Sequence, residues 1–206
     1  MPLILNDYES SYRLALWRPD EPLAYFEGKA RFTPYDERIY QEINNTVRKK
    51  EWLAVRIMLN EVLGFWPNIT YTETGKPLLN NHQRHLSISH SREMVGILLC
   101  TSPYAGIDIE KSDRNIDKVR HRFLSASEQE YLERNPEIRH KIIYWCAKEA
   151  IFKSVNAPHI EFSKQIQILD IKEDGTMKGL FVSPKETIHY DLFYREINEH
   201  IIVWTT

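Results

Sequence analysis

The sequence predicts an α+β fold in which two similar halves pack together and leave a cleft between them. Helical periodicity runs through residues 34–64 and again through 137–155, and strand-like segments follow each stretch. The segments WLAVRIML, from Trp52, and WCAKEAIF, from Trp145, also share a tryptophan and an alanine two residues later. This echo predicts a pseudo-twofold duplication. Residues 1–104 and 105–206 would each form a small, mostly antiparallel sheet packed against one long helix.

Capping signals define the elements of the first half. Thr33 can cap a helix that has Pro34 at its first position, and Gly64 can end the helical region. The pair Asn44–Asn45 is a point at which this region can divide into two helices. TETGKPLL predicts a turn, HLSISHS and MVGILLC predict strands, and a turn at 101–104 predicts that MVGILLC pairs with AGIDIEK as a hairpin.

The second half predicts two helices followed by a β-meander. Ser125 and Glu128 have the spacing of a capping box that opens a helix, and a longer helix follows Pro136 and ends near Asn156 and Pro158. Alternating residues from 166 onward predict strands, with turns at Asp174-Gly175 and near Asn198.

The composition excludes several classes of protein. The net charge of −2 gives no electrostatic case for binding nucleic acid or an anionic membrane. The apolar start is too short for a signal-peptide core and no apolar run could span a bilayer, so we expect a cytoplasmic protein. Cys100 and Cys146 lack CxxC spacing, and we expect reduced, buried thiols.

The segment GIDIEK places two carboxylates on one face of a predicted strand. Side chains alternate along a strand, so Ile107 and Ile109 can enter a core while Asp108 and Glu110 share the opposite face. That face is either simply solvated or part of a divalent-metal site, because a cation would offset the repulsion between the two charges.

The segment WCAKEAIFK places a carboxylate and an ammonium one helical turn apart. Trp145, Glu149, Phe152 and Lys153 lie on one arc of the helix. The polar pair is either an ordinary surface pair or, given its two aromatic neighbours, part of a cleft wall.

GIDIEK followed by WCAKEAIFK resembles the paired signature of the 4′-phosphopantetheinyl transferases. The upstream TGKPLL and LSISHS and the intervening FLSASE are similar to further motifs of that family, and together they cover roughly residues 45–155. The length and the internal echo resemble the surfactin-synthetase-activating type, a monomer of two similar halves. The resemblance implies transfer of phosphopantetheine from coenzyme A to a serine of an apo acyl- or peptidyl-carrier protein, with release of 3′,5′-ADP.

The resemblance also implies roles for individual residues. Mg²⁺, with Mn²⁺ as a substitute, would be held by Asp108, Glu110 and Glu149. Glu149, Glu128 and Lys153 would be catalytic. Glu149 would accept the serine proton, Glu128 is a second candidate base despite its capping role, and Lys153 would stabilise the leaving phosphate. Coenzyme A would be bound by residues from both halves, namely Arg48, Lys76, Pro77, Ser89, His90, Lys148 and Lys153.

Within that set, Arg48 and His90 would hold the 3′-phosphate, Lys76 and Ser89 would lie near the nucleotide, and Pro77 would shape the adenine pocket. Lys148 would contact phosphate from the side or face solvent. The segment before Arg48 is poorer in basic residues than is usual for this type, and Arg31 or Arg38 could substitute. Four basic residues are candidates for contacting an acidic carrier protein, namely Arg114, Lys118, Arg120 and Arg122.

Two other functions are compatible with the same residues. One is a metal-dependent phosphohydrolase acting on coenzyme A or nucleotides with water as acceptor. The other is a catalytically silent coenzyme A or carrier-binding protein.

Overall fold

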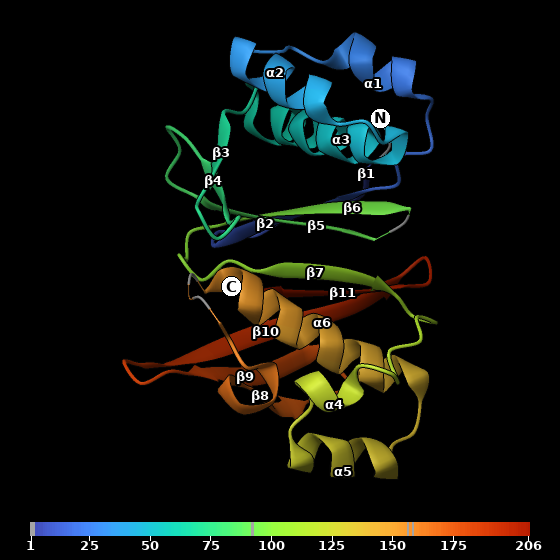
Figure 1. Cartoon of the computed structure of the whole chain (residues 1–206), viewed down its shortest axis with the longest axis vertical. Helices are drawn as coiled ribbons and strands as arrows, with labels where there is room; N and C mark the ends of the chain where they lie inside the picture. The colour runs from blue at the N-terminus through green and yellow to red at the C-terminus, as the bar shows by residue number, and fades with distance from the viewer. Residues whose placement is uncertain (1–2, 92, 156, 158) are drawn as a thin grey trace.

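The computed structural model describes residues 3–91, 93–155, 157 and 159–206. Its helices and strands form four layers, with two sheets in the middle and a long helix on the outer side of each (Figure 1). The first part of the chain contains β1 (Leu3–Tyr8), β2 (Tyr12–Trp17), α1 (Leu23–Lys29), α2 (Pro34–Glu42), α3 (Thr46–Leu63), β3 (Ile69–Tyr71), β4 (Pro77–Leu79), β5 (His85–Ser91) and β6 (Met94–Cys100). The second part contains β7 (Ile107–Lys111), α4 (Arg120–Phe123), α5 (Ala126–Arg134), α6 (Ile138–Ser154), α7 (Phe162–Gln165), β8 (Ile166–Ile171), β9 (Thr176–Val182), β10 (Thr187–Ile197) and β11 (His200–Thr205).

The two large sheets are antiparallel and change over between β6 and β7. The first has the order β1-β2-β6-β5 and the second β7-β11-β10-β9-β8, while β3 and β4 form a small separate ribbon. The predicted hairpin of β6 with β7 is therefore wrong. Both edges of β6 are occupied by β2 and β5, so β7 starts the second sheet and pairs with β11. The change of sheet falls around the predicted boundary at residue 104, but the duplication and the division into two domains stay predictions.

Three hydrophobic clusters fill the spaces between the layers. One cluster packs α3 against the first sheet, another packs α6 against the second sheet, and the third joins the two sheets to each other. Strand β11 shows the alternation: Ile202 and Trp204 belong to the cluster between the sheets, whereas Ile201 and Val203 belong to the α6 cluster. Because β6 also lies between two cores, its whole length is buried and its sequence is continuously apolar.

The helix boundaries follow the predicted caps. Thr33 and Asp36 form a capping box at the start of α2, and Asn45 caps α3 by accepting a hydrogen bond from the Arg48 backbone N–H. Gly64 ends α3 in the left-handed conformation, with φ of 79°. Ser125 and Glu128 form the second predicted capping box, at the start of α5.

The second half also follows the predicted order of elements. Helix α6 occupies the expected position after Pro136, although Asn156 and Pro158, near its predicted end, lie outside the described residues. Strands β8 to β11 form the predicted meander, with positive φ at Gly175 and Asn198 in the two expected turns. Both cysteines are free and buried, as expected. Within the described ranges, every helix is too short or too polar to cross a bilayer.

Gly106, the first residue of GIDIEK, sets the distance between α6 and β7. A Cβ atom at this position would lie 1.9 Å from the backbone oxygen of Ala150. Only glycine therefore allows the helix to approach the strand so closely. This contact places the α6 residue next to Ala150, which is Glu149, beside the strand that carries Asp108.

Candidate active site

Serine side chains of β5 join the edge of the first sheet to β7, the edge strand of the second. The hydroxyl of Ser87 accepts a hydrogen bond from the Ile107 N–H at 3.1 Å, and that of Ser89 accepts one from the Ile109 N–H at 3.1 Å. These serines satisfy outward N–H groups that an edge strand would otherwise leave unpaired. The same register brings LSISHS and GIDIEK together, which are two of the motifs picked out in the sequence.

Asp108 is buried at this junction. Its side chain faces away from the core between the sheets, and only 5% of the residue is exposed. Oδ1 accepts hydrogen bonds from Ser89 Oγ at 3.1 Å and from Lys153 Nζ at 2.6 Å. The solvated-face interpretation is therefore wrong for Asp108, while the predicted inward orientation of Ile107 and Ile109 is confirmed.

Lys153 reaches Asp108 from the last turn of α6. Besides the carboxylate, its ammonium donates to Ser89 Oγ at 3.0 Å and to the Ile107 carbonyl at 3.1 Å. The interpretation of Lys153 as part of an ordinary surface pair is wrong, because its partners lie on β5 and β7. Lys153 holds the helix, the first sheet and the second sheet together at one point.

Glu149 lies within the electrostatic field of Asp108. Burial raises the pKa of Glu149 to about 7, and the negative charge of Asp108 adds to this shift, while Lys153 and Arg114 oppose it. A buried carboxyl whose pKa is raised beside a second carboxylate is a typical feature of functional sites.

The carboxylates fit a hard divalent cation. Oδ2 of Asp108 is buried and has no hydrogen-bond partner among the described residues, which leaves one oxygen of the pair free to act as a ligand. The side chains are not preassembled around a metal, since no group of three or more His, Cys, Asp or Glu residues in the described ranges is arranged to hold one. Lys153 neutralises Asp108 and Arg114 neutralises Glu110 instead. Asp108, Glu110 and Glu149 stay the predicted ligands.

Arg114 is exposed but has partners at the site. It forms an ion pair with Glu110 and lies over the ring of Trp145, with its guanidinium carbon 5.5 Å from the ring centre. All four predicted carrier contacts, Arg114, Lys118, Arg120 and Arg122, are exposed, and only Arg114 among them also has partners at the site itself.

The predicted roles of Lys148 and Glu128 at the site disagree with their positions. Lys148 is 0% exposed, and its ammonium donates to the carbonyls of Phe123 and Ile166, both at 2.7 Å, and pairs with Glu128 at 2.7 Å. Glu128 also accepts a hydrogen bond from the Ile168 N–H at 3.0 Å and caps α5. Hydrogen bonds and the ion pair inside the second half occupy their polar atoms, so Lys148 is not available to bind phosphate and Glu128 is not available to accept a substrate proton.

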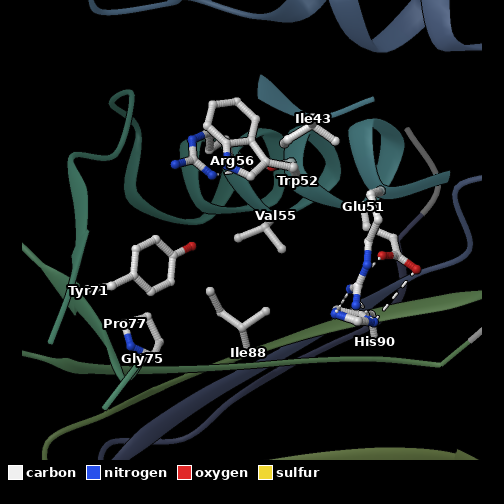
Figure 2. A pocket seen from close by; sticks show the side chains of 11 residues that line it. Ile43, Glu51, Trp52, Val55, Arg56, Tyr71, Gly75, Pro77, Ile88 and His90 are labelled. Carbon is white, nitrogen blue, oxygen red and sulfur yellow. Dashed lines mark hydrogen bonds and ion pairs between the residues drawn. The ribbon is translucent and has the colours of Figure 1, made fainter. Parts of the chain in front are cut away.

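A cavity of about 490 Å³ opens in the first half, between α3, the turn before β4 and β5 (Figure 2). His90 lies at one end of it and Gly75 and Pro77 at the other (Figure 2), and Arg48, which also lines it, is 2.5 Å from His90. A smaller cavity of about 230 Å³ shares Gly75 and Pro77 with the first and is lined by Lys153. The two cavities are therefore neighbours, one lined by Arg48 and the other by Lys153, the partner of Asp108.

Lys76 and Ser89 make contacts at the junction of the two halves, and their predicted place near the nucleotide stays a prediction. The ammonium of Lys76 donates to the carbonyl of Ser154 at 2.6 Å and to that of Pro103 at 3.2 Å, so it ties the turn before β4 to the end of α6. Ser89 contacts Asp108 and Lys153 rather than the larger cavity. Both residues therefore link the first half of the chain to elements of the second half at the site.

Sequence reasoning missed several residues that line the larger cavity. Arg56 is held by Asp36 at 3.0 Å and lies over the ring of Trp52, with 3.2 Å from guanidinium carbon to ring centre. Glu51 lies between Arg48 and His90. The i,i+3 spacing of Arg48 and Glu51 was a signal that could have revealed this pair.

Comparison with known proteins agrees with this arrangement. The protein has an α+β fold with acidic and basic groups gathered next to a nucleotide-sized cavity. Residues 104–203 match the family model described as the 4′-phosphopantetheinyl transferase superfamily. Proteins named 4′-phosphopantetheinyl transferase AcpT, from Salmonella typhi and Salmonella typhimurium, are 30% and 31% identical over 113 residues. These alignments cover 52% of this chain and 59% of each relative. Over residues 104–203 the chain is therefore similar to the 4′-phosphopantetheinyl transferase superfamily, and it spans less than two thirds of the length of these relatives.

Proposed function

We propose that the protein transfers the 4′-phosphopantetheine group of coenzyme A to a serine of an apo acyl- or peptidyl-carrier protein and releases 3′,5′-ADP. The observation that carries this proposal is the cluster of Asp108, Lys153 and Glu149, in which Lys153 lines a small cavity next to the larger one lined by Arg48 and His90. The match of residues 104–203 to the superfamily model supports the choice of reaction.

The reacting groups can be assigned to atoms of the chain. The serine oxygen forms a bond to the phosphorus that carries the pantetheine, and the bond from that phosphorus to the oxygen of 3′,5′-ADP breaks. Glu149, with a pKa of about 7, accepts the serine proton directly or through a water molecule. Lys153 supplies positive charge to the leaving phosphate.

Mg²⁺, or Mn²⁺ in its place, would be held by Asp108, Glu110 and Glu149. When bound, such an ion offsets the negative charge of the pyrophosphate of coenzyme A. Because Lys153 and Arg114 pair with two of these carboxylates, we propose that both cations change partners when coenzyme A and the metal bind.

The exposed basic residues Lys118, Arg120 and Arg122 would meet the acidic surface of the carrier. Both sheets contribute to the site and belong to one chain, so a monomer is sufficient. We propose a cytoplasmic location, which agrees with reduced cysteines and a reaction between coenzyme A and a carrier protein.

The test measures 3′,5′-ADP by chromatography in reactions with Mg²⁺ and coenzyme A, with and without apo-carrier proteins. A transferase releases 3′,5′-ADP only when a carrier is present. Release without a carrier would favour the hydrolase, and no release with any carrier tried would favour a silent binding protein.

A further inference from the structure

Glu51 of α3 lies next to Arg48 and His90, and all three side chains line the larger cavity. Its Oε2 is 3.1 Å from Arg48 Nη1, and its Oε1 is 3.6 Å from His90 Nδ1. Arg48 Nη1 is in turn 2.5 Å from His90 Nε2, which closes a triangle of three side chains (Figure 2).

The three side chains differ in their access to solvent. The side chain of Glu51 is only 11% exposed, against 60% for Arg48 and 36% for His90. The carboxylate is therefore covered by the two groups that an anion in the cavity would meet first. A ligand phosphate would contact Arg48 and His90, with Glu51 behind them.

We propose that Glu51 is a positioning residue that fixes Arg48 and His90 as a cradle for a terminal phosphate monoester. This inference rests on the proposed function, in which that group is the 3′-phosphate of coenzyme A. A half-exposed arginine without a partner samples many rotamers, and fixing it beforehand reduces the entropy lost on binding. The negative charge of Glu51, 3.6 Å from Nδ1, also favours a proton on that nitrogen, which leaves Nε2 to accept from Arg48.

Among the described residues, few other positively charged groups lie where they could bind the phosphate. The segment before Arg48 is poor in basic residues, with Arg31 and Arg38 as the predicted substitutes, and Arg56 pairs with Asp36 inside the protein. Holding one arginine and one histidine rigidly is a way to bind a phosphate with few positive charges.

The test compares binding of coenzyme A and 3′-dephospho-coenzyme A by calorimetry, a readout that does not depend on turnover. In the wild-type protein we expect coenzyme A to bind more tightly. Glu51→Ala should weaken coenzyme A binding by about tenfold, which corresponds to one arginine contact of ordinary strength, and leave 3′-dephospho-coenzyme A within about twofold. Glu51→Gln keeps one acceptor oxygen and should give a smaller loss.

Glu61→Gln, at an exposed position on the same helix, is the matched control and should change neither affinity. Equal losses for both ligands would mean that Glu51 has only a structural role, and tighter coenzyme A binding in Glu51→Gln would mean that the carboxylate opposes the phosphate. A wild-type protein that binds both ligands equally would also overturn the inference. Selective loss without carrier modification would leave the inference standing and reject the proposed transferase activity.

Discussion

Lys153 Nζ lies 2.6 Å from Asp108 Oδ1, and this ion pair joins the last turn of α6 to the edge strand of the second sheet. The lysine takes one oxygen of the carboxylate, while the other oxygen is buried and unpaired among the described residues. The contact brings together the two motifs that were recognised separately in the sequence. It also places a positive charge where the proposed reaction needs one.

Replacing Asp108 by Asn should abolish the response to divalent metal. The amide keeps the shape of the side chain but removes the charge that would bind Mg²⁺ and that pairs with Lys153. Loss of a group that only orients a metal ligand costs about 10–100-fold in activity, so loss of a ligand itself should cost about 100-fold or more. Thermal unfolding with and without Mg²⁺, together with transfer rates, checks this. Asp170→Asn, at an exposed position on β8, is the control. A normal Mg²⁺ response in Asp108→Asn would place the metal elsewhere.

Replacing Glu149 by Gln should stabilise the metal-free protein at high pH. Burial, with the Asp108 charge, raises the pKa of Glu149 from 4.5 to about 7. The folded state therefore prefers the protonated carboxyl, and ionisation destabilises the fold progressively between these two pH values. At pH 8 the cost is at most about 3 kcal/mol, from 1.4 kcal/mol per unit of pKa. Urea unfolding in a chelator should show Glu149→Gln more stable than the wild type at pH 8 and equal to it at pH 4.5. A wild type that is the more stable at pH 8 would contradict this.

Breaking the buried pair of Lys148 and Glu128 should damage stability rather than chemistry. Lys148→Met leaves the Glu128 carboxylate buried without its cation, which typically costs about 3–5 kcal/mol. We expect a lower free energy of unfolding but an unchanged rate of transfer per folded molecule. Lys164→Met, which removes a lysine from an exposed i,i+3 pair, should change stability by less than about 1 kcal/mol. A stable Lys148→Met protein with a raised Michaelis constant for coenzyme A would restore the predicted phosphate contact.

Reversing two exposed charges should weaken recognition of the carrier alone. Lys118→Glu with Arg122→Glu is expected to raise the Michaelis constant for apo-carrier protein, because like charges would meet across the interface. The Michaelis constant for coenzyme A should not change, since neither residue lines its cavity. Lys185→Glu, at an exposed site before β10, is the control. Equal effects on both substrates would exclude these residues as a carrier-binding surface.

Local signals predicted much of the fold. The capping residues Thr33 and Ser125 and the left-handed Gly64 define helix boundaries through contacts close in sequence, and the structure confirms them. Strand pairing depends on partners distant in sequence, which explains the wrong hairpin. Strand β2, missing from the prediction, occupies the edge of β6 that the hairpin would have used.

The same limit applies to the candidate site. Helical periodicity correctly placed Glu149 and Lys153 on one face of α6, but it could not show that their neighbour Lys148 is enclosed by carbonyl groups from α4, α7 and the start of β8. Nor could it show that Lys76 reaches the end of α6. Both outcomes depend on tertiary packing of segments that are far apart in the chain.

The most direct test of the central claim is intact-mass spectrometry of apo-carrier proteins after incubation with coenzyme A and this protein. With Mg²⁺ and the wild-type protein, we predict that at least one carrier gains a single phosphopantetheine group. With a chelator, or with Asp108→Ala in place of the wild type, the carrier should keep its original mass. An unmodified carrier in every wild-type reaction, or full modification by Asp108→Ala, would contradict the account.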